Sequence, residues 1–163
     1  MQIRDFQPDD AEVVNALALS AFAQYKAQYI DWDVFSQNIQ RMSLLSGIGE
    51  IILAEEDDEI CGAVAYIGPH RPKADFFDPR WPIIRMLVVN PNNRGKGAGR
   101  SLTNACVERA KRDKSSVIAL HTSPMMEVAL NMYLRMGFAW AREAPALHGV
   151  PYDVYIKNLG SDF

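Results

Sequence analysis

Three glycines at alternate positions, Gly95, Gly97 and Gly99, stand between an apolar run and a segment with helical periodicity. The apolar run, 83–89, has the length and composition of a mostly buried strand. The segment that follows places small and apolar residues on one helical face: Leu102, Ala105, Cys106 and Ala110. Glycines let a backbone approach a ligand closely, and the N–H groups at a helix N-terminus favour phosphate oxygens. The sequence therefore predicts a strand–loop–helix unit that binds a phosphate-bearing cofactor.

The spacing of this loop disfavours two common nucleotide loops. A P-loop requires Gly-Lys-Ser/Thr, but Lys96 is followed by Gly97. A dinucleotide fingerprint requires G-x-G-x-x-G, and this chain has G-x-G-x-G, which is one residue short. A nucleotide-binding protein of either class is therefore the weaker hypothesis.

Two segments carry a resemblance to a known family. From Val89 to Arg100 the chain reads V-x-P-x-x-R-G-x-G-A-G-R, which resembles the coenzyme A pyrophosphate loop of the GNAT superfamily of N-acetyltransferases. From Ala129 to Phe138 it reads A-x-x-x-Y-x-x-x-G-F, which is similar to a later segment of that family and follows in the family's order. The resemblance implies acetyl-CoA as cosubstrate. No metal is expected, because the two cysteines lack metal-site spacing and the three histidines lie far apart in the sequence.

The resemblance also implies the GNAT acyl-CoA N-acyltransferase fold, an α/β (α+β mixed) architecture with a central twisted mixed β-sheet flanked by helices. Hydrophobic periodicity agrees with this fold. Strands are expected at 2–6, 50–56, 60–67, 83–89, 117–121, 138–143 and 152–157. Helices are expected after a capping box at Asp9 and Glu12, and at 33–46, 100–113 and 127–136. The sequence thus predicts one domain, 1–163, with loops at 68–82 and 144–150.

The family position of each loop residue implies a part in holding the cofactor. The pantetheine arm is expected to pair, as an added strand would, with the backbone of Leu87, Val88 and Val89. The pyrophosphate is expected on the loop residues Arg94, Gly95, Lys96, Gly97, Ala98, Gly99 and Arg100. The charges of Lys96 and Arg100 either reach a phosphate or stay solvated. Backbone N–H groups near Leu87 and Val88 are the expected polarisers of the thioester carbonyl.

Tyr133 is the residue that the resemblance offers as the acid for the leaving thiolate. The alternative is a core tyrosine on an apolar helical face, because Tyr133 shares its face with Met132 and Met136. Met126 stands where many relatives carry Asn, so one hydrogen bond to the cofactor is expected to be missing.

No general base is assigned directly. Some family members place Glu four residues before Val89, but this chain has Arg85, which stays protonated and cannot act as a base. Arg85 either binds a substrate carboxylate or is a structural ion-pair partner. His121, at the end of the strand 117–121, is the candidate for proton relay, because histidine titrates in the useful range. Alternatively, His121 is a structural histidine and water acts as the proton relay.

The loop 68–82 and the region 25–35 are the expected walls of the acceptor site. Their aromatic rings are His70, Phe76, Phe77, Trp81, Tyr29 and Trp32. Asp75 and Asp78 could attract a cationic amine, unless the loop simply folds onto the core through its aromatic residues.

Composition limits the class of protein. With 163 residues, a net charge of −3, a pI near 5.6 and no Lys/Arg-rich tract, the chain lacks the signature of a nucleic-acid partner. The absence of a long apolar run disfavours a membrane partner. Cys61 and Cys106, both in apolar segments, are expected to be reduced core thiols of a cytoplasmic protein. The leading hypothesis is an N-acetyltransferase of a small-molecule or peptide amine. The alternatives are a CoA-binding sensor without turnover and an acetyltransferase of aminoacyl-tRNA; the resemblance makes a homodimer plausible.

Overall fold

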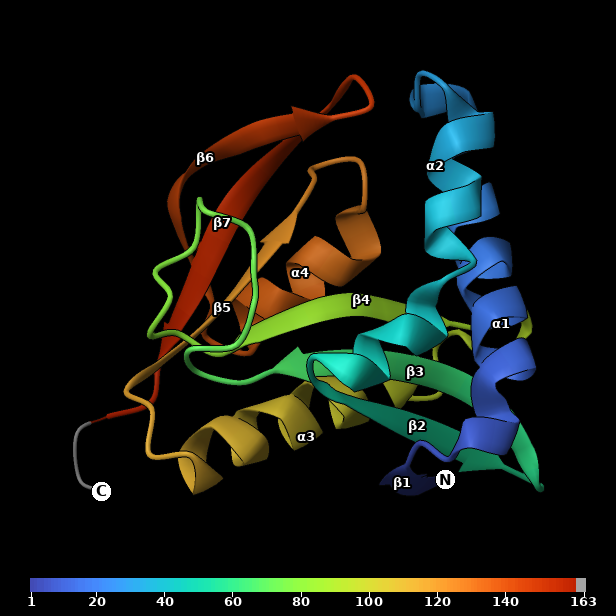
Figure 1. Ribbon diagram of the computed structural model, residues 1–163, viewed down its shortest axis with the longest axis horizontal. Coiled ribbons are helices and arrows are strands. Elements are labelled where there is room, and N and C mark those ends of the chain that lie inside the picture. Colours follow the sequence, from blue (N-terminus) through green and yellow to red (C-terminus); the bar gives the residue numbers. More distant parts are fainter. Residues whose placement is uncertain (161–163) are drawn as a thin grey trace.

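Seven strands form one mixed sheet with helices on both faces in the computed structural model, which describes residues 1–160 (Figure 1). The strands, in the sheet order β1-β2-β3-β4-β5-β7-β6, are β1 (Gln2–Asp5), β2 (Glu50–Glu56), β3 (Glu59–Ile67), β4 (Ile83–Val89), β5 (Val117–Thr122), β6 (Ala139–Leu147) and β7 (Val150–Asn158). The α-helices are α1 (Ala11–Ala23), α2 (Trp32–Ile39), α3 (Ala98–Arg112) and α4 (Glu127–Arg135). Short 3-10 helices are η1 (Pro8–Asp10), η2 (Lys26–Gln28), η3 (Met42–Gly47) and η4 (Pro91–Asn93). The predicted fold class and element order are confirmed.

Alternate side chains of β3 enter two cores, one on each face of the sheet. Ala63, Ala65 and Ile67 belong to the core that includes α1 and α2, whereas Val64 and Tyr66 belong to the core that includes α3 and α4. A strand buried on both faces reads as a nearly continuous apolar run, which is the pattern of β3. Helix α3, which follows the glycine loop, is thereby held against the centre of the sheet (Figure 1).

Leu102 is a main contact of α3 with this centre. Its side chain is 0% exposed, and a Cβ added to Gly62 of β3 would stand 2.9 Å from Leu102 Cδ1. Leu102→Ala is expected to lower the free energy of unfolding by about 2–5 kcal/mol, because buried methyl groups are lost and a cavity remains. Urea unfolding measures this loss. Leu44→Ala is the control, since Leu44 is 70% exposed; an equal loss for both would contradict the prediction.

Strands β4 and β5 separate after one residue pair. Ile83 pairs with Ala119, and among the described residues no later residue of β4 pairs with β5. On its other edge β4 pairs with β3 through a bulge at Met86, whose φ of 55° is unusual for a residue with a side chain. Strand β5 pairs instead with β7. The backbone of β4 that faces β5 therefore lacks a strand partner beyond Ile83.

The helix predicted at 33–46 is wrong in its second half. Helix α2 ends at Ile39, and the chain continues through a break into η3. The cause is tertiary: Ser43 N–H donates to Asn15 Oδ1 of α1 at 2.8 Å, and so makes no helical bond. The predicted inward residues Phe35, Ile39 and Met42 are nevertheless buried.

Two chain turns also differ from expectation. The capping box is formed by Gln7 and Asp10 of η1 rather than by Asp9 and Glu12. The Asp10 carboxylate accepts from Gln7 N–H at 2.7 Å and also pairs with Arg4. The predicted loop 144–150 is mostly strand, because the left-handed residues His148 and Gly149 (φ 46° and 80°) close a tight β6–β7 hairpin. None of the helices in residues 1–160 is long and apolar enough to cross a membrane.

Candidate active site

The glycine loop turns the chain from β4 into α3. Asn90 begins the turn by accepting a hydrogen bond from Asn92 N–H at 2.9 Å. Gly95 and Gly97 have φ values of 79° and 86°, in the left-handed region where other residues are strained. A Cβ added at either glycine would meet nothing within 4 Å, so the backbone angle rather than crowding requires glycine. Gly97 is the N-cap of α3, and the N–H groups of the first helical turn lie at this loop.

A cavity of about 370 Å³ lies beside this loop, between the end of α1, strand β4 and helix α4. Its apolar lining includes Leu87, Val89, Phe22, Tyr25, Met126, Met132 and Met136. Three arginines also line it, Arg94, Arg100 and Arg135. An apolar groove with cations at its border suits the pantetheine and phosphate parts of coenzyme A.

Most of the residues expected to hold the cofactor line this cavity: Leu87, Val89, Arg94, Gly95, Gly97, Ala98, Gly99 and Arg100. Val88 points into the opposite core, so only its backbone is available. Lys96 is not in the lining, and its Nζ lies 3.9 Å from the Glu56 carboxylate. Arg135 was missed by sequence reasoning, although it lies inside the A-x-x-x-Y-x-x-x-G-F segment. Its position in that segment was the available signal.

Tyr133 of α4 is 5% exposed and packs against Phe138, with ring centroids 5.7 Å apart. Within residues 1–160 its hydroxyl makes no hydrogen bond to another side chain or to the backbone. Burial raises the pKa of the phenol, so the hydroxyl keeps its proton at neutral pH. Tyr133 can therefore donate a proton or a hydrogen bond, but it cannot act as a base.

His121 of β5 lies among aromatic rings. Its centroid is 4.9 Å from that of Tyr152, 5.3 Å from Phe76 and 5.8 Å from Phe77. Burial, with a smaller contribution from the charge of Arg85, lowers the pKa of His121 to about 4. The imidazole is therefore neutral at pH 7 and can accept a proton, although only weakly.

The lowered pKa of His121 predicts a loss of stability in acid. The unfolded chain binds a proton near pH 6.5 and the folded chain only near pH 4, so the free energy of unfolding falls as pH drops through this window. The full effect is about 3 kcal/mol. Denaturant unfolding from pH 7 to pH 4 measures it, and His121→Gln is expected to flatten the curve over this range. An unchanged curve in His121→Gln would contradict the assignment.

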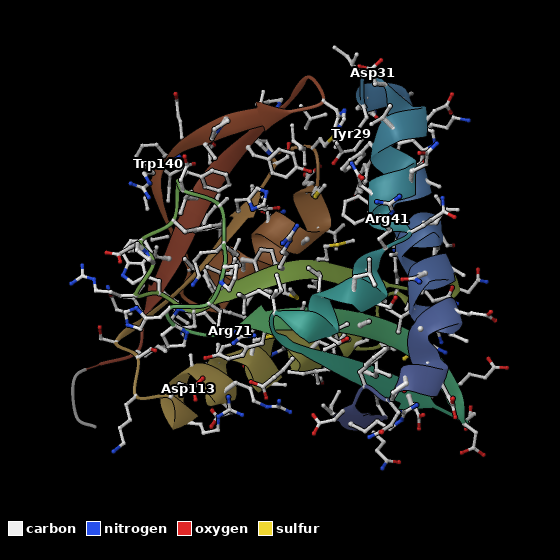
Figure 2. The ribbon with its side chains drawn as sticks, in the orientation of Figure 1. Tyr29, Asp31, Arg41, Arg71, Asp113 and Trp140 are labelled. Atoms are coloured by element: carbon white, nitrogen blue, oxygen red, sulfur yellow. The ribbon has the colours of Figure 1, made fainter. Side chains whose placement is uncertain are left out.

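Only some of the residues expected to line the acceptor site lie near one another in the structure. Phe76 and Phe77 lie at His121, and the Tyr29 hydroxyl lies 2.5 Å from that of Tyr152. His70 and Trp81 instead line a separate hollow of about 850 Å³ at the C-terminal end of α3. Arg71 and Asp113 mark this hollow in Figure 2, whereas Tyr29 lies beside α2. Asp78 forms an ion pair with Arg80 at 2.7 Å, which offsets its charge. Although this hollow is larger, it contains neither the glycine loop nor Tyr133.

Comparison with known proteins places these features in a family. Residues 12–138 match the Acetyltransferase (GNAT) family. S-alkylcysteine N-acetyltransferase of Bacillus subtilis (strain 168) is 26% identical over 133 residues, covering 80% of this chain and 74% of that protein. L-amino acid N-acyltransferase MnaT of Escherichia coli (strain K12) is 23% identical over 135 residues, covering 83% and 75%.

Solved structures with low sequence identity share the fold. A GCN5-related N-acetyltransferase from Rhodopseudomonas palustris has a TM-score of 0.76 at 17% identity, covering 97% of this chain and 95% of that chain. The yncA protein of Salmonella typhimurium, solved with its cofactor acetyl-CoA, has a TM-score of 0.70 at 16% identity, covering 98% and 94%. Because the family match spans most of the chain, the protein belongs to the GNAT family of N-acetyltransferases, whose fold binds acetyl-CoA.

Proposed function

We propose that this acyltransferase moves the acetyl group of acetyl-CoA to a primary amine of a small molecule, or to an exposed peptide amine, by direct attack in a ternary complex. The observation that carries the proposal is that strand β4 lines the cofactor groove and also borders the gap where β4 and β5 separate. Leu87 and Val89 of β4 line the groove, and β4 leaves β5 after Ile83. The two sequence relatives, one named for S-alkylcysteine and the other for L-amino acids, support a small-molecule acceptor.

The unpaired edge of β4 is assigned to the cofactor. Beyond Ile83 its N–H and C=O groups have no partner on β5, so they can pair with the amides of the pantetheine arm. An N–H group at this edge near Leu87 and Val88 is assigned to the thioester carbonyl, where it stabilises the negative charge of the tetrahedral intermediate. Arg94 and Arg100 are assigned to the phosphates, together with the N-terminus of α3.

In the proposed reaction the neutral amine nitrogen attacks the thioester carbon, so that a C–N bond forms and the C–S bond breaks. Tyr133 gives its proton to the departing thiolate, and the amine proton leaves to water or through His121. Tyr133 then recovers a proton from solvent. Because the pKa of His121 is about 4, the step needs an amine that arrives largely unprotonated or is deprotonated by water.

Calorimetry with acetyl-CoA, followed by a thiol-release screen over amino acids, polyamines, aminoglycosides and short peptides, tests the proposal. Binding with turnover of one amine class supports it. Binding without turnover by any amine would favour the CoA-binding sensor, and absence of binding would overturn the cofactor assignment. The single domain 1–163, the homodimer and the cytoplasmic location stay predictions.

A further inference from the structure

Arg85 lies where β4 and β5 begin to separate. It follows Ile83 by two residues, as His121 of β5 follows Ala119, and Ile83 pairs with Ala119. Side chains two residues apart on a strand share a face, so Arg85 and His121 point to the side of the sheet that carries α1 and α2. The positive charge of Arg85 contributes to lowering the pKa of the His121 imidazole. The two side chains are therefore neighbours across the opening.

In the part of the chain that the structure describes, Arg85 has no acidic partner. Among residues 1–160 its guanidinium takes part in no ion pair, whereas Arg4, Arg109 and Arg112 each contact two carboxylates. No acidic group raises its pKa. The structural ion-pair alternative thus finds no partner in the described part of the chain. This leaves a substrate carboxylate as the other reading of Arg85.

The surroundings of Arg85 make an added anion favourable. The side chain is solvent-accessible, yet enough protein surrounds it that desolvation lowers its pKa. Its neighbour His121 is neutral at pH 7 and is packed by Phe76, Phe77 and Tyr152. A partly desolvated cation without a counter-charge is costly, and guanidinium binds carboxylate through two parallel hydrogen bonds.

The distance along β4 suits an amino acid. Arg85 precedes Leu87, where the thioester is expected, by two residues, with only the bulge residue Met86 between them. In an α-amino acid the amine and the carboxylate are attached to the same carbon. A carboxylate held by Arg85 would therefore leave the amine between the guanidinium and the thioester carbon. A cationic amine without a carboxylate would instead be repelled by Arg85.

We infer that Arg85 binds the carboxylate of the acceptor, and that this makes a free α-amino acid, rather than a polyamine or an amino-acid amide, the preferred substrate. The inference rests on the proposed function and replaces the expectation of a cationic amine. Arg85 is then a specificity-determining residue that contacts the acceptor and not the cofactor.

The test compares acceptors that differ only in the carboxylate. A panel of free L-amino acids is assayed beside the corresponding amides, with acetyl-CoA saturating, in the wild type, Arg85→Gln and Arg85→Lys. The wild type is expected to prefer the acid. Arg85→Gln is expected to lower kcat/KM for the acid by about 100-fold and for the amide by less than about 3-fold, because only the acid loses a charged hydrogen-bond pair. Arg85→Lys is expected to recover part of the loss, since it restores charge without the planar fork.

Lys111→Gln is the charge-matched control, because Lys111 is half exposed near the end of α3 and pairs with Glu108. It is expected to leave both activities unchanged. An equal loss of acid and amide activity in Arg85→Gln, or a wild-type preference for amides, would overturn the role of Arg85 while leaving the acetyltransferase intact. Failure of every amine in the wild type would overturn the proposed function, and with it the inference.

Discussion

Gly97→Glu is expected to weaken acetyl-CoA binding by at least about 100-fold, which is the largest effect on the cofactor that a single substitution in this chain should have. Gly97 has a φ of 86°, so any side chain strains the N-cap of α3. A carboxylate there would also face the expected phosphates and would cancel the positive end of the helix dipole. Calorimetry with acetyl-CoA measures the change.

Two further variants separate the causes. Gly97→Ala carries the backbone strain without the charge, so it is expected to bind acetyl-CoA with an intermediate affinity. Gly47→Glu is the matched control, because Gly47 is exposed in η3 and a Cβ there meets nothing within 4 Å. It is expected to bind normally. Normal binding by Gly97→Glu itself would show that the glycine loop does not hold the cofactor.

Tyr133→Phe is expected to lower kcat by about 100-fold while the affinity for acetyl-CoA stays unchanged. The hydroxyl has no partner among the described side chains, so its removal leaves no buried group unsatisfied and the contact with Phe138 remains. A large loss of rate without a loss of stability would therefore report the departure of the thiolate. Single-turnover measurement of thiol release is the direct readout.

Tyr155→Phe is the control for this experiment. Tyr155 is buried in the same core as Tyr133, and burial also raises the pKa of its phenol. It has no assigned part in the reaction, so its kcat is expected to equal that of the wild type. Equal rates for Tyr133→Phe and Tyr155→Phe would make Tyr133 a packing residue.

The elements that the sequence located well are those with local causes. The strand 83–89 was predicted with the bounds of β4, because an apolar run there meets Pro91 and a glycine loop. The end of α4 was predicted from Gly137 to within one residue; in the structure Gly137 adopts a φ of 94°, and Phe138 N–H donates to Tyr133 C=O as in a helix-ending motif. Such signals are contained within a few residues of chain.

The errors have long-range causes. Nothing near Ser43 announces that Asn15, from another helix, takes its N–H and ends the helix predicted at 33–46. Likewise, His70 and Trp81 are aromatic neighbours of Phe76 and Phe77 in sequence, yet His70 and Trp81 line the separate hollow whereas Phe76 and Phe77 lie at His121. That Arg85 has no ion-pair partner within residues 1–160 is equally invisible in sequence, since acidic residues are plentiful in the chain.

The bulge at Met86 determines the face of the sheet on which each later side chain of β4 lies. In a regular strand, residues 85, 87 and 89 would all point to the same face. The additional residue reverses the alternation, so that Leu87 and Val89 pack with the α3–α4 core while Arg85 stays on the side of α1 and α2. With this bulge, side chains two positions apart on β4 lie on opposite faces of the sheet, apolar ones toward the expected cofactor and a cation toward the proposed acceptor.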